Sequence, residues 1–228
     1  MLFTSLGVGV LFFLPRRRST FAALKLGRIW QMARSPSFLA AGFFLFTAAI
    51  SYAILLGVYA GFIDKAIGAG SVGRITVFFY LARVVASFLG GPISDRLGRG
   101  VVLRAGFLLA AFGFIATVLV AGRFSKGAAF QGSHYITLIL SSLFLGLQVG
   151  VIPVATTAFV GDALAQEQRH LGLGAIFFWR DLAMVITLLG GEALVAHFSF
   201  ETTILLFAII FIGCAIVAPR VKVSSPRG

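Results

Sequence analysis

The sequence has one cysteine and very little charge. Cys214 cannot form an internal disulfide, and no group of His, Cys, Asp or Glu has the spacing of metal ligands, so we expect no metal site. Charged residues make up 11% of the 228 residues, and only 7 of them are acidic. No nucleophile–base pair, phosphate-binding loop or nucleotide-binding motif is present. These absences argue against an enzyme and against an ATP-driven pump, and they predict no cofactor.

The chain is instead rich in apolar residues. They form 59% of the chain, and the mean hydropathy is +1.03. Apolar runs of about 18 residues or more indicate transmembrane helices. The sequence therefore predicts an all-α integral membrane protein in the lipid bilayer, a bundle of six transmembrane helices. The expected spans are 37–63, 73–93, 101–122, 135–160, 171–198 and 202–218.

The regions outside these spans define the expected domain organisation. Segment 1–14 is apolar but only about 21 Å long as a helix, against about 30 Å of hydrocarbon, so we expect a partial transmembrane helix there. Segment 15–36 is a basic cytoplasmic linker, 37–218 is the six-helix unit, and 219–228 is a cytoplasmic tail.

The basic residues predict the orientation in the membrane. The net charge of +12 does not indicate nucleic-acid binding, because these residues fall in short loops and form no continuous stripe. Thirteen of them lie on one side of the spans, in the linker, the loop around Arg99, Arg169 and the tail. Four lie on the other side, namely Lys65, Arg74, Arg123 and Lys126. The positive-inside rule then places both termini of the six-helix unit in the cytoplasm of a multi-pass cell-membrane protein.

Two spans resemble each other in sequence. The second contains FFYLARVVASFLGG at 78–91, and the fifth contains FFWRDLAMVITLLGG at 177–191. The offset of about three spans inverts the orientation of one copy relative to the other. The bundle is therefore expected to be a 3+3 inverted repeat, although pairs of Phe and Gly also recur by chance in such a composition.

The most polar stretch between two apolar runs is GPISDRLGRG, at 91–100. Gly91 and Gly98 flank Asp95, Arg96 and Arg99 in the order G-x-x-x-D-R-x-G-R. A tight turn between helices favours glycine, because the backbones approach closely and φ can be positive. An ordinary basic cytoplasmic hairpin is the alternative interpretation.

This pattern resembles the loop signature of the major facilitator superfamily, except that Gly100 stands where the family has a basic residue. The stretch GDALAQEQRHLG at 161–172 is similar to a second family motif. The resemblance implies the C-terminal six-helix half of a transporter. It further implies alternating-access transport of a small-molecule substrate with a second six-helix half, either a missing N-terminal half or another copy. A truncated or subunit-type membrane module that does not transport is the alternative.

Three charges are expected inside the membrane. Arg83 and Asp181 lie at matching depths, so each is the other's expected partner, whereas the adjacent Arg180 points about 100° away from Asp181. Intramembrane charges are functional candidates by default. The charges either border the translocation path, with Asp181 exchanging a proton, or form a structural ion pair.

Polar residues of the first and fourth spans are candidates for the substrate path, because the family fold would place these spans around a central cavity. They are Ser51, Tyr52, Ser141 and Gln148. Gln148 is the strongest of them, since it is a large amide in the middle of a span. A hydrogen bond between helices is the alternative role for Gln148.

Overall fold

The computed structural model describes residues 34–125, 131–164 and 169–218, and all secondary structure in this part of the chain is helical. The expected partial helix at 1–14, the tail at 219–228 and nearly all of the linker lie outside the described residues. The helices are, in order, α3 (Pro36–Ile54), η1 (Leu55–Tyr59), α4 (Ala60–Ile67), α5 (Ala69–Leu97), α6 (Arg99–Phe124), α7 (Gly132–Ala163), α8 (Arg169–Phe198) and α9 (Phe200–Val217).

Within the described residues, six continuous helices are long and apolar enough to cross a membrane, which confirms the predicted fold class. The first consists of α3, the π-helical turn η1 and α4 in series. Most helices extend a few residues beyond the predicted spans, because polar residues at their ends continue the helix outside the apolar run. α5 and α6 show this most clearly: only Gly98 separates them, where a loop of about seven residues was expected.

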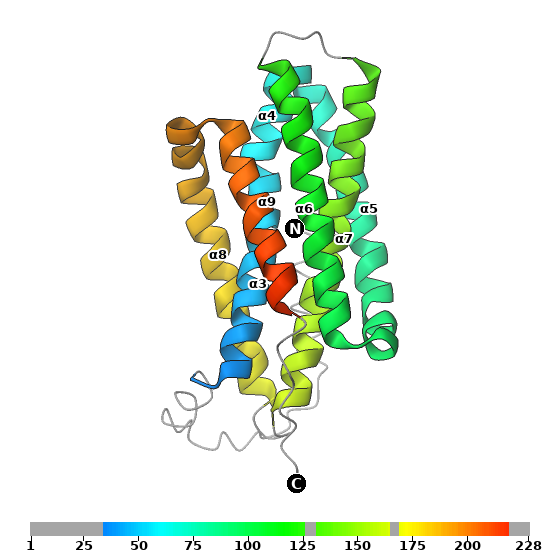
Figure 1. The fold of residues 1–228 in the computed structure, drawn as a ribbon, viewed down its shortest axis with the longest axis vertical. Coiled ribbons are helices and arrows are strands. Elements are labelled where there is room, and N and C mark those ends of the chain that lie inside the picture. Colours follow the sequence, from blue (N-terminus) through cyan, green and yellow to red (C-terminus); the bar gives the residue numbers. More distant parts are fainter. Residues whose placement is uncertain (1–33, 126–130, 165–168, 219–228) are drawn as a thin grey trace, which may run out of the picture.

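Gly98 forms the sharp junction between α5 and α6. Its φ of 90° lies in a region that favours glycine, as the turn motif predicted. Asp95 and Arg96 belong to α5 and not to a loop, so this part of the expectation was wrong, whereas Gly91 lies in α5 as the predicted span 73–93 has it. The junction lies at the same end of the bundle as the first residues of α3 and α8 (Figure 1). The described arginines at this end are Arg34, Arg96, Arg99, Arg104 and Arg169.

The helices form two units of three, α3–α6 and α7–α9. α5 packs along α7, and α8 packs along α3, so the second helix of each unit packs on the first helix of the other. α3 and α7 also contact each other, as do α6 and α9. This exchange of partners agrees with the predicted 3+3 organisation.

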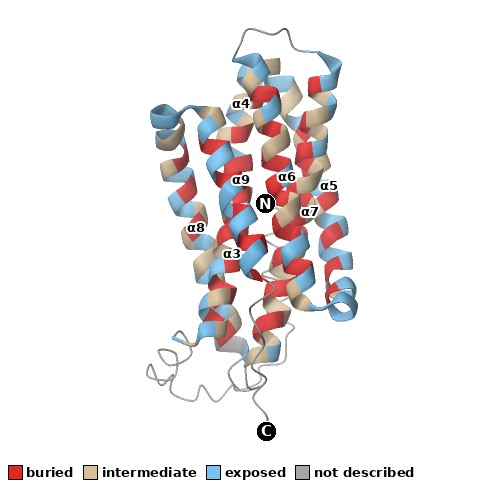
Figure 2. Ribbon diagram, viewed as in Figure 1, coloured by how far each residue is buried: buried red, intermediate tan, exposed pale blue. Residues whose placement is uncertain are grey.

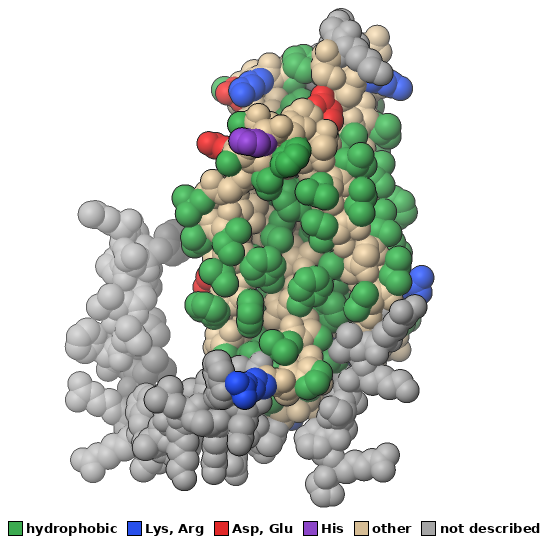
Figure 3. All heavy atoms as spheres, turned by 60° about the vertical axis from the view of Figure 1, so that its left-hand side comes forward, with side chains coloured by type: hydrophobic (Ala, Val, Ile, Leu, Met, Phe, Trp, Pro, Cys, Tyr) green, Lys and Arg blue, Asp and Glu red, His purple; other side chains and the backbone are tan. Residues whose placement is uncertain are grey.

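α5 and α8 bury little of their surface against the rest of the chain. Only 22% of the residues in the apolar stretch of each are buried, compared with 61% for the helix that begins at Pro36 and 56% for α7 (Figure 2). Apolar side chains cover the middle of the face that includes α8 and α9, and most of its charged side chains lie toward the ends (Figure 3). Part of the apolar surface of α5 and α8 therefore remains available for lipid or for another helical unit.

Candidate functional site

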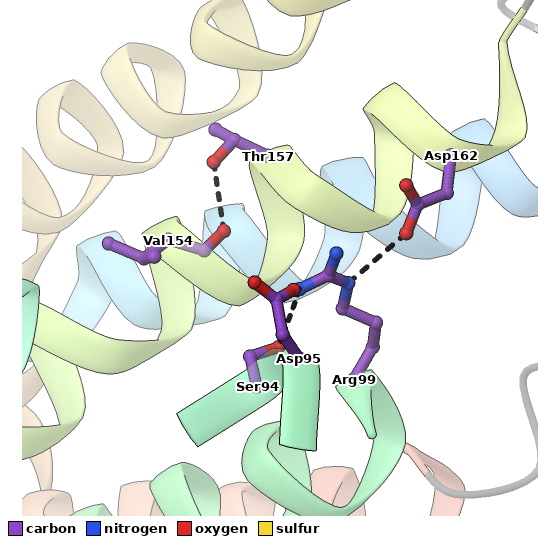
Figure 4. Close-up of polar contacts among 6 residues, drawn as sticks. All are labelled: Ser94, Asp95, Arg99, Val154, Thr157 and Asp162. Carbon is purple, nitrogen blue, oxygen red and sulfur yellow. Dashed lines mark hydrogen bonds and ion pairs between the residues drawn. The ribbon is translucent and has the colours of Figure 1, made fainter. Parts of the chain in front are cut away.

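The first candidate site is a polar cluster at the Gly98 end of the bundle (Figure 4). The Arg99 side chain donates hydrogen bonds to Asp95 at 2.6 Å, to Ser94 at 3.1 Å and to Asp162 at 3.1 Å. Asp95 lies in the last turn of α5, and Arg99, four residues later, is the first residue of α6 beyond the Gly98 junction. Asp162 comes from the last turn of α7. One guanidinium thus links the end of α5, the beginning of α6 and the end of α7.

The two charged residues of the motif before Gly98 differ in their contacts. Asp95 forms an ion pair with Arg99 across the Gly98 junction. Arg96 is exposed and forms no ion pair with a described residue. Asp162 and Ser94 were not singled out as site residues. Asp162 could have been chosen from the sequence, since it is the acidic residue of the second motif, GDALAQEQRHLG.

The second candidate site is a cavity of about 330 Å³ between α3, α5, α7 and α8. Arg83, the central residue of α5, lines it together with Tyr52 of α3 and with Arg180 and Asp181 of α8. The middle of a 29-residue helix is about 21 Å from either end, so Arg83 lies halfway along a helix that is long and apolar enough to cross a membrane. The expected intramembrane charges therefore meet at one cavity.

The pairing of these charges differs from the prediction. Asp181 forms its ion pair with Arg180, with Nε and Oδ1 2.8 Å apart, and not with Arg83. Adjacent residues diverge on a helix, but the arginine side chain is long enough to bend back. The side chain of Arg180 is 44% exposed and that of Asp181 is 62% exposed. Arg180 also lies over the Phe177 ring, 4.7 Å from its centroid.

Arg83 is held by an aromatic ring. Its guanidinium carbon lies 4.8 Å from the centroid of the Tyr52 ring, a cation–π distance. The same ring stacks on Phe79, with centroids 5.8 Å apart. Among the described residues no carboxylate oxygen lies within 4.0 Å of the Arg83 nitrogens. The cavity therefore contains a positive charge without a negative partner in this part of the chain.

Three of the four predicted path residues lie outside the cavity. Ser51 and Gln148 are fully buried between α3 and α7, with the Ser51 hydroxyl 2.7 Å from Gln148 Oε1. Ser141 is buried between α6 and α7, where it bonds Thr117 and the Gly113 carbonyl. These contacts favour the helix–helix hydrogen bond as the role of Gln148.

The Ser51–Gln148 contact also indicates how the amide is oriented. Ser51 has one hydroxyl proton, yet its oxygen lies 2.8 Å from the Ala48 carbonyl as well as near Oε1 of Gln148. Turning the amide by 180° keeps its shape and lets Nε2 donate to Ser51, which then donates to Ala48. We therefore assign the amide nitrogen of Gln148 to the Ser51 side.

Comparison of the sequence with models of known protein families identifies the family of this chain. The model of the Major Facilitator Superfamily matches residues 39–227, which is most of the chain. The chain belongs to this superfamily. Members of the superfamily are membrane transporters and not enzymes, and the multi-pass helical fold described above agrees with this assignment.

One relative is a protein of Arabidopsis thaliana named "Probable anion transporter 6, chloroplastic". It is 26% identical to this chain over 141 residues, which are 62% of the chain and 25% of the relative. The aligned part is thus about a quarter of that protein. Among the described residues, no group of three or more His, Cys, Asp or Glu side chains could hold a metal ion.

Proposed function

We propose that this chain is one six-helix half of a secondary transporter that moves a small solute by alternating access. The cavity between α3, α5, α7 and α8 carries the proposal, because it combines three charged side chains at mid-bilayer depth in a member of a transporter superfamily. Charges at that depth are costly and are kept where they contact a path or a partner. The four helices come from both three-helix units, and a movement of a second six-helix half against this one, along the poorly buried faces of α5 and α8, would open and close the cavity.

The Gly98 cluster supplies a contact that can form and break during such a movement. Arg99 joins the α5–α6 junction of the first unit to Asp162 of the second unit. The carboxylates of Asp95 and Asp162 are well exposed, so this contact is weak enough to be reversible. We infer that it stabilises the state in which this end of the bundle is closed.

The poorly buried faces of α5 and α8 are where we place a second six-helix half. α5 and α8 flank the cavity, so a partner on these faces would close its open side. The Arabidopsis relative is named as an anion transporter, and a cavity with two arginines suits an anionic solute. We further propose that the protein lies in the cell membrane with the Gly98 junction in the cytoplasm.

Cysteine labelling tests both the cavity and the orientation. In a Cys214→Ala background, we expect Ser87→Cys, in the cavity wall, to react with a water-soluble thiol reagent from both sides of the membrane. Ile209→Cys is the control at similar depth, because Ile209 is exposed on α9 and faces lipid. Thiolates form only in water, so Ser87→Cys should react at least about tenfold faster. Equal, slow labelling at both positions would show that the cavity is not a solute path.

Two further positions report the orientation in the same experiment. Leu97 and Gly70 are exposed at opposite ends of α5. With an impermeant reagent on intact cells, Gly70→Cys should be labelled and Leu97→Cys should be protected. The reverse pattern would place the Gly98 junction outside the cell.

A further inference from the structure

The charges around the cavity do not balance. Arg83 and Arg180 are positive, and Asp181 supplies the single negative charge. Asp181 forms its ion pair with Arg180, with Oδ1 and Nε 2.8 Å apart. Arg83 is left with the Tyr52 ring and makes no hydrogen bond or ion pair with a described residue. A ring quadrupole attracts a cation but does not neutralise it, so a bound anion would complete the site.

The donors of Arg83 suit one particular anion geometry. A guanidinium offers five N–H groups in a planar fork that can donate to the two oxygens of a carboxylate, or to two of the three oxygens of a sulfonate. Contact with the Tyr52 ring uses the face of this group, which leaves the N–H groups at its edge available to a ligand. The other polar groups of the wall without an ion pair are the hydroxyls of Ser87 and Tyr52.

The rest of the wall is apolar. It consists of Leu45, Ala48, Ala49, Val149, Val154 and Met184, with Gly150 and Pro153. Inorganic phosphate and sulfate have hydrated oxygens on every side, and some of them would face these apolar residues without a hydrogen-bond donor to replace water. An apolar group beside a single anionic group would instead match both parts of the wall.

We propose that the solute bound in this cavity is a small organic monoanion, whose charged group binds Arg83 and whose apolar body lies against α3, α7 and Met184. This proposal rests on the proposed transporter function and specifies its substrate class. Arg83 is then the residue that selects for negative charge. The volume of about 330 Å³ accommodates a single-ring compound.

Equilibrium dialysis of the purified full chain in detergent tests this assignment. The probe is labelled benzenesulfonate, which stays anionic at neutral pH, and its neutral counterpart is benzenesulfonamide. We expect the chain to bind the anion at least about tenfold more tightly than the neutral compound. Arg83→Gln should abolish this preference and Arg83→Lys should keep part of it, because lysine retains the charge but not the fork. Arg104→Gln removes an exposed arginine outside the cavity and should bind as the unsubstituted chain does.

Three results would overturn the proposal. They are equal binding of the anionic and neutral compounds, an unchanged preference in a folded Arg83→Gln variant, and displacement of benzenesulfonate by inorganic phosphate at equal concentration. If Arg83→Gln fails to fold, the binding of benzenesulfonate, benzenesulfonamide and inorganic phosphate to the unsubstituted chain still decides whether the cavity selects an organic anion. Selective anion binding without any solute flux would support the organic-anion assignment and reject transport. Flux of a neutral or cationic solute without anion binding would support transport and reject the organic-anion assignment.

Discussion

Gly146→Ala is expected to lower the apparent melting temperature of the purified chain by about 5–10 °C, although it adds only one methyl group. Overpacking of a well-packed interface costs about 1–3 kcal/mol, and more where backbone must move. A Cβ atom at Gly146 would collide with the Phe79 carbonyl oxygen of α5 and would lie 2.9 Å from the Ala82 Cβ. Backbone atoms cannot rotate away as a side chain can, so α5 and α7 would have to separate.

Gly150 repeats this arrangement one turn later. Its Cβ atom would lie 2.5 Å from the Arg83 carbonyl oxygen and 2.6 Å from the Ala86 Cβ. The spacing G-x-x-x-G of α7 faces small residues of α5, and such pairs let membrane helices approach closely. Gly150→Ala should therefore destabilise the chain as Gly146→Ala does, and it should also displace the turn of α5 that carries Arg83.

Gly213→Ala is the matched control for both substitutions. Nothing lies within 4 Å of a Cβ atom at Gly213 in α9, and alanine favours a helix over glycine by about 0.5–1 kcal/mol. Its melting temperature should stay the same or rise. Unfolding is followed by tryptophan fluorescence. If Gly146→Ala and Gly213→Ala have the same melting temperature, α5 and α7 are not in close backbone contact.

Arg99→Asp should have the second largest effect, because it replaces the cation that joins three helix ends by a third carboxylate. Hydrogen bonds to charged groups contribute about 1.5–3 kcal/mol, and the exposure of Asp95 and Asp162 reduces this, so we expect a loss of about 2 kcal/mol. For a chain of this size that corresponds to about 4–8 °C in melting temperature. The loss should become smaller at high salt, where charge repulsion is screened.

A charge exchange separates the ion pair from other effects of this substitution. In the double variant Arg99→Asp with Asp162→Arg, a cation at position 162 again faces carboxylates at 95 and 99, so at least half of the lost stability should return. Arg104→Asp is the control, because Arg104 is exposed and forms no ion pair with a described residue. A double variant that is less stable than Arg99→Asp would refute the proposed link between the junction and α7.

The six spans and the Gly98 turn could be predicted from the sequence, because each depends on local chemistry. Long apolar runs require helices in lipid, and the glycine in G-x-x-x-D-R-x-G-R meets the need for a positive φ. The helix ends were less predictable, since polar residues such as Asp95 and Arg96 continue α5 beyond the membrane. The depth of Arg83 and Asp181 followed from counting residues, and both residues do line one cavity.

The partners of the buried polar groups could not be predicted, because they depend on how the helices are rotated against one another. Gln148 and Tyr52 both lie in the middle of a span, but only Tyr52 is turned toward the cavity, while Gln148 bonds Ser51. The Arg180–Asp181 pair depends on a side-chain conformation that the angular separation on a helix does not determine. The close approach at Gly146 had a signal, since the G-x-x-x-G spacing to Gly150 is visible in the sequence.

Solute counterflow in proteoliposomes tests most directly whether this chain transports. The vesicles contain the purified chain and are loaded with unlabelled benzenesulfonate, mannitol or choline, and the entry of the same labelled solute is followed. Exchange through a carrier concentrates the label inside for a short time and needs no knowledge of the coupling ion. We expect this transient accumulation for benzenesulfonate and its loss in Arg83→Gln. Entry no faster than in protein-free vesicles for all three solutes would contradict transport by this chain alone or by an assembly of its own copies, and would favour a membrane module that only assembles with a different partner.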